Sequence, residues 1–230
     1  MSATADHPLL AEHLRRWVGA WPAPSRGVRV VGDAARSSPT WDGSVRPLRG
    51  VGEGTGAVVA VPPAAADLVA RAVRDDLERE GLGDELGEIL GVGPAVVGRG
   101  VFRSTAVVAS DVDDLGEWFD RQSSELPAWL EPFNGPRLVA RGGDGSVLGA
   151  VGIKVHDSLG HELAVVTEER ARGRGIARRL VATAARRVLD DGAVPTYLHA
   201  HDNVGSARVA DAVGFADVGR TVIGLWPAGS

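Results

Sequence analysis

The sequence of 230 residues contains no cysteine. The absence of thiols excludes disulfide bonds, thiolate-ligated metal sites and a cysteine nucleophile. No run of residues approaches the roughly 20 consecutive apolar positions that a transmembrane helix needs. The first eight residues also lack the basic patch and apolar stretch of a secretory signal. We therefore expect a cytoplasmic protein.

Lysine and tyrosine are almost as scarce, because the chain holds one of each, Lys154 and Tyr197. The near-exclusive use of arginine among the basic residues is typical of a GC-rich genome and favours a bacterial source. The formal net charge of −5 argues against bulk binding of nucleic acid. Hydrophobic residues make up 44% and charged residues 24%, as in ordinary globular proteins, so an intrinsically disordered chain is excluded.

Short strand and helix patterns alternate through the first 93 residues. The pattern predicts a helix over 9–17, strands over 28–31 and 57–61, and a helix over 64–80 that ends at Gly81. The Gly- and Pro-containing stretch 91–94 is typical of a boundary between domains. We therefore predict an N-terminal module at 1–93, of unknown role, and a second domain at 94–230.

The second domain has a more regular order of elements. It predicts strands at 96–102, 106–109, 138–141, 147–155, 163–166 and 196–200, and a closing strand after Gly214-Phe215. It predicts helices at 111–122, 124–130, 176–189 and 206–213. The residues 142–145 between two of the strands are a hairpin signal. This order indicates a mixed α/β domain.

One turn carries the sharpest chemical signal. Arg170, Arg172 and Arg174 alternate with Gly173 and Gly175 directly before the amphipathic helix over 176–189. Glycines let a backbone approach a ligand closely, and the first amides of a helix have no internal acceptor. The helix dipole adds positive potential at the same place. The turn therefore predicts a site for a phosphate or pyrophosphate, with a solvated Arg-rich turn as the alternative.

The order of motifs resembles the GNAT superfamily of N-acetyltransferases. The resemblance rests on Arg170-x-x-Gly173-x-Gly175-Ile176-Ala177 after a short strand, then a long helix, a strand, Asn203-Val204-Gly205-Ser206, and a helix ending in Gly214-Phe215. It covers 160–216 and extends back to about 94. It implies an α/β fold with a GNAT-like mixed, largely antiparallel sheet flanked by helices, to which 1–93 adds a small α/β module. A degenerate copy of the same fold is one alternative for that module.

The resemblance also implies an activity and a set of binding residues. The activity is transfer of an acetyl group from acetyl-CoA to a primary amine by direct attack, with no metal. The pyrophosphate would lie against Arg172, Gly173, Arg174, Gly175, Ile176 and Ala177, with Arg178 near the phosphates. The pantetheine arm would pair with Val165, Val166 and Thr167, and Asn203 would contact the cofactor.

The chemistry of the thioester makes further demands on the chain. A backbone N–H aimed at the carbonyl oxygen stabilises the oxyanion that forms during attack, and Val166 is our candidate donor. Many family members carry a tyrosine seven residues after the Asn, as acid for the departing thiolate, but Ala210 stands at that position here. Protonation by water or by the amine's own proton is one alternative. An acyl-CoA-binding protein with little or no catalysis is another, and a purely structural domain is a remote third.

The amine acceptor needs a base, and candidates lie near the strand before the motif. We favour Glu162, followed by His161, with a surface role for both as the alternative. His156 and Asp157 are weaker candidates. Neighbouring residues of a strand face opposite ways, so only one of Glu162 and His161 can face a cleft.

Two other groups of residues are ambiguous. His199 and His201 share one face of a strand, but zinc needs further ligands, so we expect strand-end packing and no metal. Trp118, Trp129 and Phe133 fit an apolar core or the lining of an acceptor pocket. The partners we expect are acetyl-CoA and an amine-bearing small molecule, peptide or protein, and neither nucleic acid nor a membrane. The sequence does not indicate an oligomeric state.

Overall fold

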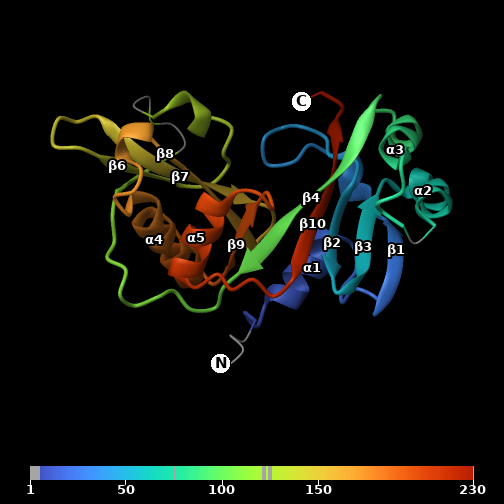
Figure 1. The fold of residues 1–230 in the computed structure, drawn as a ribbon, viewed down its shortest axis with the longest axis horizontal. Helices are drawn as coiled ribbons and strands as arrows, with labels where there is room; N and C mark the ends of the chain where they lie inside the picture. The colour runs from blue at the N-terminus through green and yellow to red at the C-terminus, as the bar shows by residue number, and fades with distance from the viewer. Residues whose placement is uncertain (1–5, 75, 121–122, 124–125, 230) are drawn as a thin grey trace. The chain divides into compact units, whose positions relative to one another are not determined.

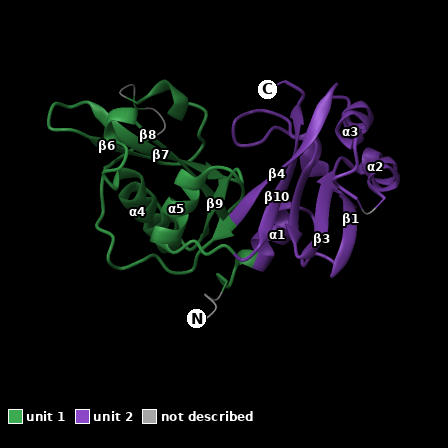
Figure 2. Cartoon of the chain, viewed as in Figure 1, with its two compact units in different colours: residues 1–10, 103–217 green, residues 11–102, 218–230 purple. Residues whose placement is uncertain are grey.

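The computed structural model describes residues 6–74, 76–120, 123 and 126–229. The chain divides into two compact units (Figure 2), with residues 1–10 and 103–217 in unit 1 and residues 11–102 and 218–230 in unit 2. This division differs from the boundary that the sequence predicts between 93 and 94. The difference arises because β10 (Arg220–Pro227) pairs with both β2 (Arg49–Glu53) and β4 (Ala95–Ser104), and so completes unit 2.

Unit 2 contains the strand order β1-β3-β2-β10-β4. Strand β1 (Arg26–Gly32) runs parallel to β3 (Thr55–Val61), whereas the other neighbours are antiparallel. The helical segments are α1 (Leu10–Trp17), η1 (Ala34–Ser37), η2 (Pro63–Ala65), α2 (Ala66–Val73) and α3 (Leu82–Leu90). Apolar residues of α2, α3 and β3 form its core with Ile223 of β10.

The helix predicted over 64–80 is wrong beyond Val73. Helix α2 ends there because Arg74 adopts a left-handed conformation, with φ of 44°. Gly81 precedes α3 instead of ending a helix, and its φ is 73°. The sequence hides α3 because Gly87 lies in it, and a side chain there would meet the carbonyl oxygen of Gly93 at 2.0 Å. The glycine that lowers helix propensity is thus required for packing.

Unit 1 contains the strand order β9-β8-β7-β6-β5, and all neighbours except β8 and β9 are antiparallel. The strands are β5 (Glu117–Phe119), β6 (Arg137–Arg141), β7 (Val147–Val155), β8 (Gly160–Thr167) and β9 (Val194–His199). The helical segments are η3 (Ala128–Leu130), η4 (Glu169–Ala171), α4 (Ile176–Asp190) and α5 (Val204–Val213). The predicted mixed, largely antiparallel sheet flanked by helices is confirmed.

Helices α4 and α5 contact each other, and α4 packs on β7 and β8 (Figure 1). Leu180, Val181 and Val188 of α4 are fully buried against apolar residues of the sheet. The predicted stripe of the helix over 176–189 is therefore its buried face. The predicted hairpin between β6 and β7 is also present, closed by a hydrogen bond from the Gly142 amide to the Ser146 carbonyl of 2.8 Å.

The segment between β4 and β6 differs from its prediction. The strand predicted at 106–109 and the helices predicted at 111–122 and 124–130 are wrong, because the described residues form only β5 and η3 there, while 121–122 and 124–125 lie outside the described residues. Side chains of α4 hold this segment through its carbonyl groups. Arg186 donates to Ala109 and Val112, and Arg179 donates to Asp114 at 2.8 Å. Carbonyls satisfied in this way do not need a helix.

The face of the sheet opposite α4 is covered by the segment around η3. A side chain at Gly152 would meet the ring of Phe133 at 2.5 Å, so this ring lies directly on β7. Arg137 is 1% exposed and donates to the carbonyls of Leu130 and Phe133, which fixes the segment to β6. Trp118 instead lies under Arg187 of α4, with 5.5 Å between the guanidinium carbon and the ring centroid, and so belongs to the core on the other face.

No helix among the described residues has the length and hydrophobicity of a membrane span.

Candidate functional site

Strands β8 and β9 separate from each other halfway along β8. Their parallel pairing runs from Gly160 opposite Val194 to Leu163 opposite Tyr197. Beyond that point β8 continues to Thr167 and is paired with β7 alone in the described chain. The side of β8 that faces away from β7 therefore has backbone groups open to a ligand over the last residues of the strand.

The Arg/Gly turn follows directly on this open strand. Gly173 and Gly175 have φ of 74° and 75°, a conformation that favours glycine, and a Cβ at either position would meet nothing within 4 Å. Within the part of the chain that the structure describes, no side chain caps α4, and Arg179 is the first helix residue whose amide bonds to the preceding turn. The amides that precede Arg179 in the first turn of α4 therefore form an unscreened anion site.

One cleft of about 740 Å³ joins the open strand to this turn. Among the predicted cofactor residues, every one except Arg174 lines the cleft: Val165, Val166, Thr167, Arg172, Gly173, Gly175, Ile176, Ala177, Arg178 and Asn203. Arg174 is exposed instead. The structure thus brings residues from β8, α4 and the start of α5 to one place.

Two residues of the cleft have defined partners of their own. Asn203 caps α5, because its side-chain oxygen accepts from the Ser206 amide at 2.9 Å. Arg178 donates to the Asp111 carboxylate at 3.2 Å and remains half-exposed. An anion in the cleft would therefore meet Arg178 beside an exposed carboxylate with which it competes.

Besides the anion site, the cleft offers a hydrogen-bonding group to a ligand. The Thr167 hydroxyl oxygen is buried and has no hydrogen-bond partner among the described residues. An orphaned hydroxyl at the end of an open strand can be satisfied by an amide or hydroxyl of a ligand. Together with the open space beside Gly173 and Gly175, it indicates room for a ligand that carries both an anionic group and hydrogen-bonding amides.

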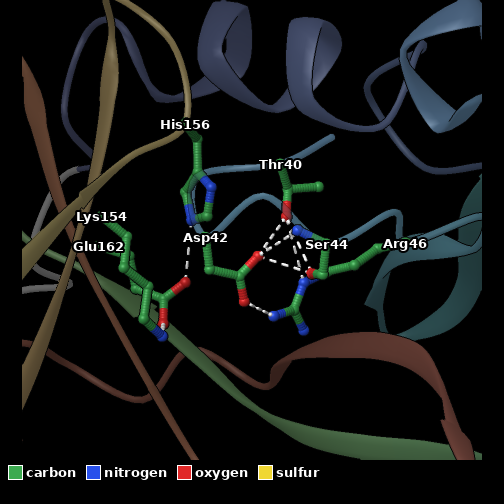
Figure 3. Close-up of polar contacts among 7 residues, drawn as sticks. All are labelled: Thr40, Asp42, Ser44, Arg46, Lys154, His156 and Glu162. Atoms are coloured by element: carbon green, nitrogen blue, oxygen red, sulfur yellow. Dashed lines mark hydrogen bonds and ion pairs between the residues drawn. The ribbon is translucent and has the colours of Figure 1, made fainter. Parts of the chain in front are cut away.

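Glu162 lies on the sheet face opposite α4, beside Lys154 of β7 and His156, which directly follows that strand. Its carboxylate bonds to the Lys154 ammonium and lies 2.9 Å from His156 Nε2 (Figure 3). Burial would raise the pKa of Glu162, but Lys154 and His156 together hold it well below its usual range. His161, the other candidate base, is half-buried, and its backbone lies opposite Val155. Glu162 is thus an ionised carboxylate whose oxygens are both engaged.

A second polar cluster belongs to unit 2 and is local in sequence. Asp42 accepts hydrogen bonds from the Thr40 hydroxyl and the Ser44 amide and bonds to Arg46 (Figure 3). Burial would raise the pKa of Asp42, and these hydrogen bonds lower it instead. All these residues lie within one turn, so the cluster stabilises a loop.

His199 and His201 do not share one face of a strand, because β9 ends at His199. His199 is buried, and its Nε2 accepts from Arg103 Nε at 3.1 Å, whereas His201 is exposed. The described residues contain no group of three or more His, Cys, Asp or Glu side chains placed to hold a metal ion.

The sequence reasoning missed Tyr197 and Ser206 in the lining of the cleft. Tyr197 lies on β9 at the last position that pairs with β8, and Ser206 lies in the first turn of α5. A lone tyrosine on a predicted strand next to the Asn203 motif was the available signal. Its significance depended on knowing where β8 and β9 separate, which the sequence does not show.

Comparison with known proteins identifies the domain. Residues 105–215 match the family model described as Acetyltransferase (GNAT) family. No curated protein matches the chain.

Three solved structures resemble the chain at low identity. They are a GNAT-family protein from Novosphingobium aromaticivorans DSM 12444 (16% identity, 75% of this chain and 84% of that chain, TM-score 0.48), a GNAT-family acetyltransferase from Colwellia psychrerythraea (12%, 73% and 76%, 0.47) and a GCN5-related N-acetyltransferase-like protein from Streptococcus suis 89/1591 (17%, 73% and 71%, 0.45). The family model, and not these distant likenesses, identifies residues 105–215.

Proposed function

From the premise that residues 105–215 form a domain of the acetyltransferase (GNAT) family, we propose that the protein transfers an acetyl group from acetyl-CoA to a primary amine. The observation that carries the proposal is the single cleft in which the open end of β8 meets the uncapped start of α4. An extended arm with amides fits the open strand, and a pyrophosphate fits the helix start. The acceptor is an amine-bearing small molecule, peptide or protein.

Each part of the cleft has a role in this proposal. Val165, Val166 and Thr167 pair with the pantetheine arm through backbone groups, and the Thr167 hydroxyl gains the partner that it lacks. The backbone N–H of Val166 stabilises the oxyanion. The turn from Arg172 to Ala177 holds the pyrophosphate, with Arg178 and Asn203 at its border.

Glu162 takes part in deprotonation of the amine through His156. A carboxylate with a lowered pKa is a weak proton acceptor by itself. His156 Nε2 lies 2.9 Å from Glu162, so the two side chains act in this proposal as a pair that takes up the amine proton, with Glu162 orienting the imidazole.

Titration calorimetry with acetyl-CoA, followed by thiol release with a panel of amines, tests the proposal. We expect saturable binding, and free CoA that appears only when a suitable amine is present. Absence of acetyl-CoA binding would contradict the proposed function.

One observation favours a second function, an acyl-CoA-binding protein with little or no catalysis. Ala210 replaces the tyrosine that many family members use as the acid, and it is fully buried. This alternative predicts acetyl-CoA binding without thiol release for any amine. The same two measurements therefore separate the two functions.

A further inference from the structure

The only tyrosine of the chain lies where β8 and β9 separate. Tyr197 is opposite Leu163 in the last pair of the parallel ladder, so its side chain stands at the closed end of the open strand. It is 2% exposed, yet it lines the same cleft as Val166 and Asn203. A buried polar side chain at the end of a cleft can contact a bound ligand at a place that bulk water reaches poorly.

Ser206, in the first turn of α5, lines the same cleft as Tyr197 and lowers the pKa of its phenol. The Ser206 amide is fixed in turn by the Asn203 cap at 2.9 Å. Tyr197 and the start of α5 therefore line the cleft together, and the Tyr197 ring packs against Phe215 with 5.7 Å between the ring centroids.

A buried cation influences the same phenol. Arg103 is 4% exposed, donates to His199 Nε2 at 3.1 Å and to the Phe215 carbonyl at 3.0 Å, and bonds to Asp211. The positive charge of Arg103 stabilises a negative charge on the phenol oxygen of Tyr197 and so lowers the pKa of that phenol. A phenol that gives up a proton transiently is stabilised by such a neighbour.

Ala210 lies one helical turn after Ser206 on α5 and belongs to the same apolar cluster as Tyr197. A methyl group there supplies no proton, and no other phenol exists in the chain. The geometry points to Tyr197 as the residue that protonates the departing thiolate of CoA, from strand β9 instead of helix α5. This assignment rests on the proposed function.

The step balances as follows. The amine nitrogen forms a bond to the thioester carbonyl carbon, and the carbon–sulfur bond breaks with its electron pair on sulfur. The sulfur takes the proton of the Tyr197 hydroxyl, and the nitrogen releases a proton to water at the mouth of the cleft as it becomes an amide. A proton from that water converts the phenolate back to the phenol. Burial raises the pKa of Tyr197 above its usual value, while Ser206 and Arg103 oppose that rise, so the phenol holds its proton at neutral pH.

Because Tyr197 is the only tyrosine, the ultraviolet absorbance of phenolate titrates this residue alone. We expect a higher midpoint with bound CoA than with bound desulfo-CoA, which lacks the sulfur, because a thiolate beside the phenol disfavours phenolate. Ser206→Ala should raise the midpoint of the free protein, since the hydroxyl that stabilises phenolate is gone. Identical midpoints with the two bound ligands would overturn the assignment.

Kinetics supply a second, independent readout. Tyr197→Phe keeps the ring and removes the hydroxyl, and we expect kcat to fall about 10²-fold with an unchanged KM for acetyl-CoA. The fall in rate of the wild type at alkaline pH, where the phenol ionises, should be absent from this variant. Phe215→Leu disturbs the ring packed 5.7 Å from Tyr197 and is the matched control, which should keep the alkaline fall.

The outcomes separate the two levels of the proposal. If neither CoA nor desulfo-CoA binds, the proposed function fails. If both bind and Tyr197→Phe retains the rate and pH profile of the wild type, the function stands and the assignment of Tyr197 is wrong.

Discussion

The pairing of Glu162 with the only lysine of the chain sets how unit 1 responds to acid. The folded pKa of Glu162 lies below that of the unfolded chain, where a glutamate titrates near pH ~4.3. Stability from the cluster is therefore fully present above that pH and is lost as the pH falls toward the folded pKa. Both carboxylate oxygens are engaged, so the cluster acts as one unit.

We predict that Lys154→Met destabilises the protein at neutral pH by about 3–5 kcal/mol, the usual cost of removing one partner of a buried pair. The difference from the wild type should shrink as the pH falls below about 4, because Glu162 is then protonated more often. Denaturant unfolding across pH measures both effects. Asp191→Asn, which breaks an exposed pair with Arg187, is the control and should cost no more than about 1 kcal/mol.

The proposed part of Glu162 in deprotonating the amine gives a second prediction. Glu162→Gln should leave acetyl-CoA affinity unchanged, because the residue does not line the cofactor cleft, and should lower kcat by about 10²–10⁴-fold. Raising the pH should rescue part of the rate, since more of the amine is then unprotonated. Pre-steady-state and steady-state rates across pH measure this effect.

His156→Gln provides the matched comparison for Glu162→Gln. If the two residues act as a pair, the double variant should be no slower than the slower single variant. Superimposed pH–rate profiles of Glu162→Gln and the wild type would exclude a role for Glu162 and make His161 the next candidate.

At the scale of elements, the turn before α4 has the clearest consequence. Gly173→Val places a branched side chain in the open space of the cradle and should weaken CoA binding at least about tenfold, or 1.4 kcal/mol. Calorimetry with CoA measures it.

A matched control exists at the other end of the same helix. Gly192 has φ of 76°, and a Cβ there also meets nothing within 4 Å. Gly192→Val therefore carries the same backbone strain away from the cleft, and its CoA affinity should equal that of the wild type. Equal affinities for both variants would show that the turn does not hold the pyrophosphate.

Elements with strong periodicity could be predicted from the sequence, and those held by distant side chains could not. The stripe of α4 and the turn at 142–145 depend on neighbours in sequence, so their patterns suffice. The irregular segment 105–116 depends on Arg179 and Arg186, which lie some seventy residues later in the chain. Its local composition favoured helices, because nothing local shows that its carbonyls are satisfied from α4.

The candidate site divides in the same way. The anion turn is a local motif and was predictable from its glycines and the helix behind it. The partners of Glu162 depend on the register of β7 against β8, which sets Lys154 opposite Glu162. Tyr197 depends on where two strands separate. Neither register nor separation is encoded in a local pattern, so the fixed cluster and the phenol in the cleft emerge only from the fold.

At the scale of the whole molecule, unit 2 is built from two separate parts of the chain, residues 11–102 and residues 218–230. Unit 2 includes β10, which lies between β2 and β4 in its strand order. The separate N-terminal module at residues 1–93 stays a prediction. The core of unit 2, which holds most of those residues, includes Ile223 from the other end of the chain.

We predict that Ile223→Asp disrupts unit 2 and leaves the CoA affinity of unit 1 within about twofold of the wild type, roughly 0.4 kcal/mol. Ile223 is 1% exposed, and an unpaired charge there costs several kcal/mol. Limited proteolysis should then cut within 11–102 first. Val96→Asp, at a half-exposed position of the same unit, is the control and should retain resistance. Loss of CoA binding together with protease resistance would contradict the separation of the units.

The position of β10 also affects the order in which the two units can fold during translation. Synthesis runs from the N-terminus, so residues 103–217 are complete before β10 is made. Unit 1 can therefore fold while unit 2 still lacks the strand between β2 and β4. Until translation passes Pro227, both of those strands keep an unpaired edge, which is the hazard for aggregation that chaperones act on. The part of the chain that is made first is thus the last to be finished.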